Sequence, residues 1–506
     1  MSDYLMGIDL GTSRIKVALI DLKGRIVGEG FRETNIRQSG SGLMEQDPNE
    51  YLTGTLDCVK EVLQKTGADP RRVLAVGLDG QMGGIIGVDD SFKPLTPYDL
   101  VLDIRSQKYS AVIQERCGGA IFRLSSGIWS HAQKILWWKN EANTDYRRIR
   151  KFVTLAPFVA GNMAGLSGAE AYTDYTSLFC AGLGDIHGHA WSEELCREIG
   201  CDIEKLPSVV EPWQVIGGLA AGPARVCGLM EGTPIAAGSG DQPAGFLGAG
   251  IVEPGMAIEV AGSTSVFSVC TEQYVPDVER RKVVFMNSVF PDLYYPLTYV
   301  NGGGVVLRWF RDQFIHDEKA AADNSRREAN DALDEKTRGI APGSESLYFI
   351  PHFGGRSCPN KPAVRGAWIG LNWTHTYVHM YKAILESIAY DHYGAYQRIL
   401  ELFPDLNIPS IRVTGGGAAN SVWNKLKADV MNVPYLQLER NEYATLGSCL
   451  IAGHAVGAVR DLKSTARRLA REVDRLDPDP ENHGLYQGYA QRYERLLFDI
   501  DPVWDN

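Results

Sequence analysis

A strand–turn–strand pattern occurs twice in this chain, about 250 residues apart, and it is the feature that most constrains the fold. Residues 6–21 read MGIDLGTSRIKVALID, and residues 255–272 read GMAIEVAGSTSVFSVCTE. In the first copy Ile15, Val17 and Leu19 alternate with their neighbours, which is the period of a β-strand. Two copies this far apart predict two related domains, because repeat arrays have periods of roughly 20–50 residues.

The surrounding sequence indicates an α/β architecture. A helix is expected over residues 47–67, where Asp47 and Glu50 resemble a capping pair, Pro48 suits the first turn and Gly67 can end the helix. An apolar strand, VLAVGLDG, follows at residues 73–80. The chain of 506 residues exceeds what one core of roughly 250–300 residues accommodates, and Gly and Pro cluster at 248–255. We therefore expect domains over residues 1–250 and 251–506.

The second half carries further helical patterns. Helices are expected over residues 379–403, over 421–432 with Asn420 or Ser421 as the N-cap, and over 443–459 as the final helix. Residues 316–339 are charged and Ala-rich, which predicts an exposed helical insertion.

Charge and cysteine content exclude several classes of protein. The net charge of -11 argues against nucleic acid or an anionic membrane as the main partner. The nine cysteines include no Cys-x-x-Cys pair, which favours free thiols in a reducing compartment and no structural zinc site. No apolar run reaches 18 residues and the N-terminus lacks a signal-peptide layout, so a cytoplasmic protein is expected.

Two glycine-containing stretches are candidates for nucleotide chemistry. The turn Gly11-Thr12-Ser13 offers amides and hydroxyls to phosphates, with Asp9 beside it as a ligand for hydrated Mg²⁺; the alternative is a plain hairpin. The run 415–417 precedes a helix and suits an adenine ring or a phosphate, or else is only a tight turn. Neither a dinucleotide-binding Gly-x-Gly-x-x-Gly nor a Gly-x4-Gly-Lys-Ser/Thr loop is present.

Polar residues in two other places suit a hydroxylated substrate. Asp241, in GSGDQPAG (238–245), is a candidate general base or a turn former. The stretches LDGQMGG (78–84) and VLDIR (101–105) carry groups that bind sugar hydroxyls or form a structural salt bridge. No Gly-x-Ser-x-Gly elbow supports a serine hydrolase, and no His, Cys and acidic cluster suggests a metal centre.

Taken in order, these motifs resemble the FGGY family of carbohydrate kinases, most closely its xylulokinase-like members. The resemblance spans roughly residues 6–457. Residues 366–386, GAWIGLNWTHTYVHMYKAILE, fit the second family signature. Residues 130–141 resemble the first signature around Lys134, Trp137 and Glu141 but depart from it at His131 and Trp138. The blocks GIDLGTS, GQM, TDY, GDQ, GGG and ATLG occur in the family's order.

The resemblance implies two ribonuclease-H-like domains facing across a cleft, as in actin and hexokinase, with sugar held by the first and ATP by the second. It implies that Asp241 is the catalytic base and that Asp9 organises the magnesium. The implied ATP and phosphate contacts are Gly11, Thr12, Ser13, Gly262, Ser263, Thr264, Gly302, Gly303, Gly415, Gly416, Gly417 and Asn420. The implied sugar contacts are Gln81, Met82, Asp103, Arg105, Asp241 and Gln242.

The sugar pocket departs from the family pattern. Xylulokinases typically read Ser-Gly-Gln-Met-His-Gly where this chain has Asp79 first and Gly83 fifth, and Val101 replaces a Trp. Loss of an imidazole and an indole predicts more room at Gly83 and an altered substrate.

The leading hypothesis is transfer of the γ-phosphoryl group of Mg-ATP to a hydroxyl of a ketose, with a xylulose-like pentulose as the first candidate. The alternatives are another ketose, a polyol or a sugar acid, of the ribulose, erythritol or glycerol type. A non-catalytic ATP-binding protein of actin fold is the rival from another class, and a Rossmann dehydrogenase is disfavoured by the missing fingerprint. The family resemblance also suggests a homodimer.

Overall fold

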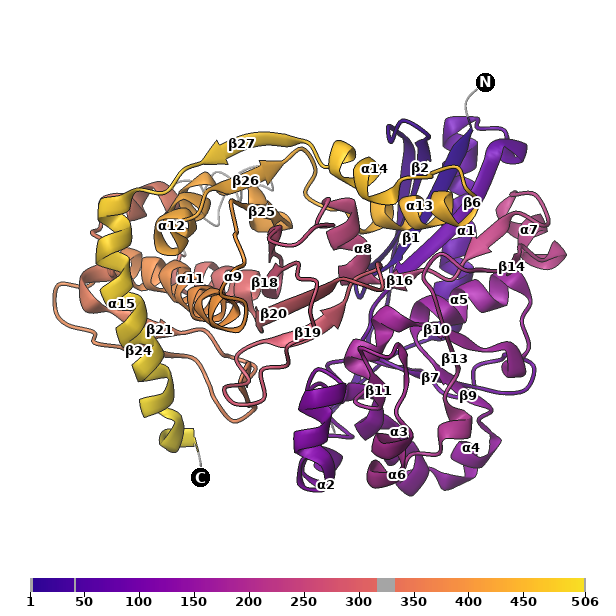
Figure 1. The fold of residues 1–506 in the computed structure, drawn as a ribbon, viewed down its shortest axis with the longest axis horizontal. Helices are drawn as coiled ribbons and strands as arrows, with labels where there is room; N and C mark the ends of the chain where they lie inside the picture. Colours follow the sequence, from indigo (N-terminus) through magenta and orange to yellow (C-terminus); the bar gives the residue numbers. More distant parts are fainter. Residues whose placement is uncertain (1–2, 41, 316–332, 505–506) are drawn as a thin grey trace.

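The computed structural model describes residues 3–40, 42–315 and 333–504, and it has two lobes (Figure 1). The N-terminal half of the chain forms one lobe and most of the C-terminal half forms the other. Each lobe contains a seven-stranded mixed sheet, so the protein has the expected two-domain α/β fold.

The sheet of the first lobe has the order β14-β15-β6-β1-β2-β3, with β16 paired to β6. The hairpin of β1 and β2 is antiparallel, and β6 runs parallel to β1. Helix α1 packs against β2 and β3. The strands are β1 (Tyr4–Leu10), β2 (Arg14–Asp21), β3 (Ile26–Glu33), β6 (Val73–Gly80), β14 (Val215–Gly218), β15 (Pro234–Ala236) and β16 (Ser239–Gly240).

The sheet of the second lobe repeats this plan in the order β19-β20-β18-β17-β25-β26-β27. Strands β17 and β18 form an antiparallel hairpin, and β25 runs parallel to β17 as β6 does to β1. The duplicated hairpins of the sequence therefore occupy equivalent places in two sheets. The strands are β17 (Ala257–Ala261), β18 (Ser265–Val269), β19 (Val284–Asn287), β20 (Tyr294–Val300), β25 (Ile411–Thr414), β26 (Tyr435–Leu438) and β27 (Glu472–Leu476).

The helices agree closely with the sequence where capping residues mark their ends. Helix α1 (Pro48–Thr66) has Asp47 as its N-cap and Gly67, with φ of 63°, as its C-cap. Asn420 is the N-cap of α12 (Ser421–Met431). The other main helices are α2 (Lys108–Leu124), α3 (Ser130–Glu141), α5 (Leu155–Ala164), α6 (Glu193–Ile199), α7 (Ala221–Cys227), α8 (Asp241–Gly248), α9 (Gly303–Phe314), α11 (Tyr377–Leu402), α13 (Ala444–Ala455), α14 (Leu462–Leu469) and α15 (Pro480–Asp499).

Helix α13 crosses from the second half of the chain onto the first lobe, where it packs against β1, β6 and α8 (Figure 1). Glycines allow this approach: a Cβ at Gly7 would lie 2.1 Å from the carbonyl oxygen of Thr445, and one at Gly77 would lie 2.2 Å from that of Ser448. A Cβ at Gly447 would lie 1.9 Å from the carbonyl oxygen of Ala244 in α8. The late ATLG block, at the start of α13, is thus one place where the second half of the chain contacts the first lobe.

Two sequence expectations about the second half need correction. The helix at 443–459 is not the last one, because α14 and α15 follow it. Of the expected exposed insertion at 316–339, residues 316–332 lie outside the described residues. In the remainder, residues 333–337 are helical as expected, but Leu333 and Asp334 are buried.

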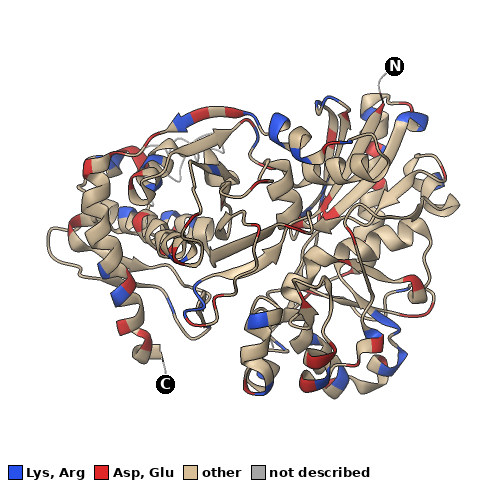
Figure 2. Ribbon diagram, in the orientation of Figure 1, with Lys and Arg blue, Asp and Glu red and all other residues tan. Residues whose placement is uncertain are grey.

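The described surface carries mixed charge. Lys and Arg alternate with Asp and Glu along the outer helices of both lobes (Figure 2). No helix within the described ranges has both the length and the apolarity that a membrane span requires.

Candidate active site

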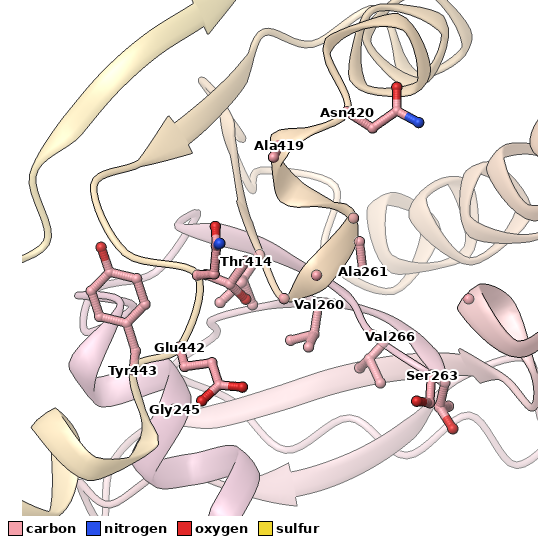
Figure 3. A pocket seen from close by; sticks show the side chains of 18 of the residues that line it. Gly245, Val260, Ala261, Ser263, Val266, Thr414, Ala419, Asn420, Glu442 and Tyr443 are labelled. Carbon is pink, nitrogen blue, oxygen red and sulfur yellow. The ribbon is translucent and has the colours of Figure 1, made fainter. Parts of the chain in front are cut away.

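A cavity of about 820 Å³ lies where the two lobes meet. Asp9, Gly11 and Lys16 of the first lobe line it. Residues from the second half of the chain, among them Val260, Ser263 and Asn420, line it from the other side (Figure 3). Predicted site residues that line the cavity are Asp9, Gly11, Asp241, Gln242, Gly262, Ser263, Thr264, Gly415, Gly416, Gly417 and Asn420. The two hairpin turns therefore face one space, although they are far apart in the sequence.

The first hairpin turn offers its backbone to the cavity, while one of its hydroxyl groups points away. Gly11 lines the cavity, and its N–H donates to the carbonyl oxygen of Arg14. The Thr12 hydroxyl donates to Gln81 Oε1 at 2.9 Å, inside the first lobe. Within the described residues, neither Thr12 nor Ser13 lines the cavity.

Asp241 is the first residue of helix α8, and it lines the cavity. Its Oδ1 atom accepts a 2.8 Å hydrogen bond from the backbone N–H of Gln242. Enclosure by protein, with the nearby Asp9 carboxyl as a second cause, raises the pKa of Asp241 to about 7. A carboxyl group with this pKa can accept a proton at neutral pH and release it again.

Gly240, the residue before Asp241, is held in place by Thr176, which directly follows the TDY block of the sequence. The Thr176 hydroxyl accepts a 2.9 Å hydrogen bond from the N–H of Gly240 and donates to the Asp174 carboxylate. Asp174 also accepts from the Ser177 hydroxyl at 2.7 Å. These buried bonds fix the start of α8, and with it the position of Asp241.

Asp9 lies opposite Lys16 across the first hairpin. The Lys16 ammonium group is 3.4 Å from Asp9 Oδ2 and forms an ion pair with Glu442 of the second lobe. Burial raises the pKa of Asp9, and Lys16 opposes that rise. Sequence reasoning assigned no role to Lys16 or Glu442. The available signals were the place of Lys16 in the hairpin opposite Asp9 and that of Glu442 shortly before the ATLG block.

Asp79 is a buried acid beneath this site. It pairs in register with Asp9 on the neighbouring strand and accepts a 2.6 Å hydrogen bond from the Ser448 hydroxyl of α13. Burial, together with the Asp9 carboxyl, holds the pKa of Asp79 well above its ordinary value. The family position normally occupied by Ser therefore carries a third carboxyl group here.

The second lobe contributes residues 415–417 and Asn420 to the cavity. A Cβ at Gly416 would have no atom within 4 Å, so this residue faces open space. The Asn420 side-chain amide caps α12 and donates to Asp334 Oδ2 at 2.8 Å. Tyr381 donates a 2.8 Å hydrogen bond to the other carboxylate oxygen of Asp334. Tyr381 and Asp334 both line the cavity, although the sequence analysis did not name either of them.

The glycines after β20 differ from expectation. Gly304 lines the cavity, and its N–H donates to the carbonyl oxygen of Gly262 at 3.0 Å. Gly302 and Gly303 do not line it in the part of the chain that the structure describes. They instead form the start of α9, where Gly302 has a φ of 101°.

Three predicted sugar contacts of the first lobe, Gln81, Asp103 and Arg105, make hydrogen bonds within the protein. Gln81 donates to Gln46 and Tyr51 at 3.2 and 3.0 Å. Asp103 accepts two bonds from the Arg105 Nε–H group and one from the Met44 N–H. Arg105 also pairs with Glu45 at 2.6 Å and lies over the Trp137 ring. Asp103 and Arg105 therefore form the salt bridge that was one of the two interpretations of this stretch.

The expected space at Gly83 is filled. A Cβ at this position would lie 2.7 Å from the Cβ atom of Val101. Gly83 and Val101, the two positions that depart from the xylulokinase-like pattern, are thus in contact. The Val101 side chain covers Gly83, which stands where that pattern has His. The expectation of a larger pocket at Gly83 is wrong for this reason.

The cavity residues fit a nucleotide with its metal ion. A volume near 820 Å³ falls within the range of ligand sites, roughly 300–1,000 Å³. Mg²⁺ bound to a nucleotide needs only one or two protein carboxylates beside the phosphates, and Asp9 can supply one. The described residues contain no group of three or more His, Cys, Asp or Glu side chains arranged for a metal ion.

Comparison with known proteins decides the family. Residues 4–248 match the N-terminal domain, and residues 257–456 the C-terminal domain, of the FGGY family of carbohydrate kinases. The chain belongs to the FGGY family. FGGY kinases are phosphotransferases with an alcohol group as acceptor, and they use ATP as the phosphate donor.

Relatives of this FGGY chain differ in their named substrates. It is 26% identical to a xylulose kinase of Staphylococcus epidermidis, over 98% of this chain and 97% of the relative. It is 25% identical to a gluconokinase of Bacillus subtilis, over 91% and 89% of the two chains. The crystal structure of xylulose kinase from Lactobacillus acidophilus matches the fold with a TM-score of 0.88 over 99% of each chain, at 21% identity. These values establish a sugar kinase and leave its sugar open.

Proposed function

We propose that this FGGY kinase phosphorylates a primary hydroxyl of a short ketose, with a pentulose as the first candidate. The observation that carries the proposal is Asp241, whose carboxyl group has a pKa near 7 and lies in the cavity that both hairpin turns line. The xylulose kinases among its relatives support a ketose acceptor.

In this proposal Asp241 accepts the proton of the acceptor hydroxyl as that oxygen attacks the γ-phosphorus atom. Gly262, Ser263 and Thr264 line the shared space, and their N–H and hydroxyl groups would bind phosphate oxygens. Gly415, Gly416 and Gly417 would hold the adenosine, and Asp9 would hold the magnesium through its bound water. When bound, Mg-ATP supplies the phosphoryl group and partly neutralises its charge.

The experiment is coupled measurement of ADP release with Mg-ATP and a panel of acceptors. The panel contains D-xylulose, D-ribulose, erythritol, glycerol and D-gluconate, and the Asp241→Asn variant is the matched control. Turnover of a ketose that the variant loses supports the proposal. Turnover of the polyols or gluconate alone replaces the ketose with that class, and ATP binding without turnover of any acceptor favours a non-catalytic binding protein.

A further inference from the structure

A buried ion pair lies behind the cavity in the second lobe. Lys427 of α12 donates a hydrogen bond to Glu259 Oε1 of β17, and both side chains are fully buried. Tyr435 donates to Glu259 Oε2 at 2.9 Å, and His392 Nδ1 lies 3.7 Å from the same oxygen atom. The proposed function gives no role to these four groups.

A pair of this kind is a weak source of stability. Two charges lose their water when the pair is buried, and apolar residues of similar volume often serve the folded state equally well. Burial raises the pKa of Glu259, but the charges of Lys427 and His392 outweigh that rise and hold the pKa at about 2. Glu259 is therefore an ion at neutral pH, and the reason for its burial is to be sought in what the pair holds in place.

Lys427 contacts a residue of the cavity wall as well as Glu259. Its Nζ atom lies 3.5 Å from the centroid of the Trp423 ring, one turn earlier on the same face of α12. Trp423 lines the cavity, although it is only 2% exposed. The indole N–H donates to the carbonyl oxygen of Leu385 at 3.1 Å. A cation over one face and a hydrogen bond at one edge together fix the orientation of this ring.

The Trp423 residue in turn supports two of the predicted nucleotide contacts. A Cβ at Gly417 would lie 3.2 Å from Trp423 Cζ3, so the indole lies against the end of the glycine run. The Trp423 backbone N–H donates to Asn420 Oδ1 at 2.9 Å. Strand β17, which carries Glu259, ends at Ala261, and the same Cβ would lie 2.9 Å from the Ala261 Cβ atom. Both elements joined by the ion pair therefore meet at Gly417.

We infer that the ion pair of Lys427 and Glu259 positions the nucleotide-binding wall, because it ties α12 to β17 and holds the Trp423 ring. The wall in question is formed by Gly417 and Asn420, to which the proposed function assigns the adenosine, so the inference rests on that function. Within the described residues, neither Lys427 nor Glu259 lines the cavity. Both are therefore positioning residues and not catalytic ones.

The test removes the pair in two ways. Lys427→Met leaves the Glu259 carboxylate buried without its cation and should lower the melting temperature. The double variant Glu259→Gln/Lys427→Met leaves no charge behind and should recover most of that loss. In both variants we expect the dissociation constant of ADP, from titration calorimetry, and the KM for ATP to rise roughly tenfold. The kcat and the KM for the acceptor should change by less than about twofold, because only nucleotide binding is altered.

Arg398→Met is the matched control. Arg398 donates to the buried carboxylate of Asp277 at 2.7 Å, and neither residue lines the cavity in the part of the chain that the structure describes. This variant should also lower the melting temperature, but it should keep the wild-type affinity for ADP. Wild-type ADP affinity in the double variant overturns the inference, and so does an equal loss of affinity in Arg398→Met. The double variant decides the question if Lys427→Met does not fold.

Failure of the proposed function gives a different result. A wild-type protein that binds ADP but turns over no acceptor would refute the kinase activity, and the ADP affinities of the variants would still decide the role of the pair. A wild-type protein that binds neither ADP nor ATP would overturn the inference together with the nucleotide site.

Discussion

Ser448 donates a 2.6 Å hydrogen bond to Asp79, and this bond joins helix α13 of the second half of the chain to the sheet of the first lobe. Both residues are fully buried. The carboxyl group beneath the active site is therefore held by the same helix that connects the lobes.

Removal of this hydroxyl should destabilise the protein. We expect Ser448→Ala to lower the apparent free energy of unfolding by about 1–3 kcal/mol, because a buried carboxyl group loses a hydrogen-bond donor. Urea unfolding followed by fluorescence measures it. Ser464→Ala, at an exposed position of α14, is the control and should change stability by less than about 0.5 kcal/mol. Equal effects of the two substitutions would contradict the role given to the bond.

The close contact between β6 and α13 gives a steric prediction. Gly77→Ala should cost about 1–3 kcal/mol, because its Cβ would lie 2.2 Å from the Ser448 carbonyl oxygen and backbone must move. Gly222→Ala in α7 is the matched control, since no atom lies within 4 Å of its Cβ, and it should be neutral or stabilising. A wild-type melting temperature in Gly77→Ala would show that the helix can move away freely.

Gly416 offers a separate test of the nucleotide end of the cavity. Gly416→Leu should raise the KM for ATP by roughly tenfold or more, equivalent to about 1.4 kcal/mol, because the new side chain would enter the cavity. Its stability should stay near that of the wild type. Gly484→Leu, on the exposed face of α15, should leave both quantities unchanged. Unaltered ATP kinetics in Gly416→Leu would exclude this end as the nucleotide site.

The ionisation of Asp241 predicts a pH profile. The base works only when deprotonated, and its pKa is raised from 3.8 to about 7. We therefore expect kcat/KM to fall about tenfold per pH unit below pH 7 and to level off above it. An unshifted aspartate would keep the profile flat down to about pH 4 to 5.

Substitution of Lys16 should shift this pH profile, because Lys16 affects the pKa of Asp241. Its positive charge lowers the pKa of Asp241, so Lys16→Met should move the acidic limb to higher pH, whatever it does to the maximal rate. An acidic limb of kcat/KM that does not move in Lys16→Met would show that Asp241 is not the base. The absence of such a limb above pH 5 would show the same. Measurement of kcat/KM between pH 5 and 9 at constant ionic strength distinguishes these results.

The sequence by itself determined the local elements and the family. Alternating apolar residues predicted the first hairpin, and the same strand–turn–strand pattern predicted the second. Asp47, Gly67 and Asn420 marked helix ends that the structure has. These signals are local, because capping and strand alternation depend on residues a few positions apart. The order of the motifs then identified an FGGY kinase, which the family comparison confirmed.

Only the tertiary structure decided which polar side chains are bonded to other protein groups and which remain available to a ligand. Asp103 and Arg105 suited a sugar site as well as a salt bridge, and the fold brings them together with Glu45 in the latter. Val101 lies against Gly83, and Lys16 pairs with Glu442, and each of these contacts forms only when the chain packs. Side-chain partners far apart in sequence are set by how strands and helices pack, and that information is absent from any short stretch of the chain.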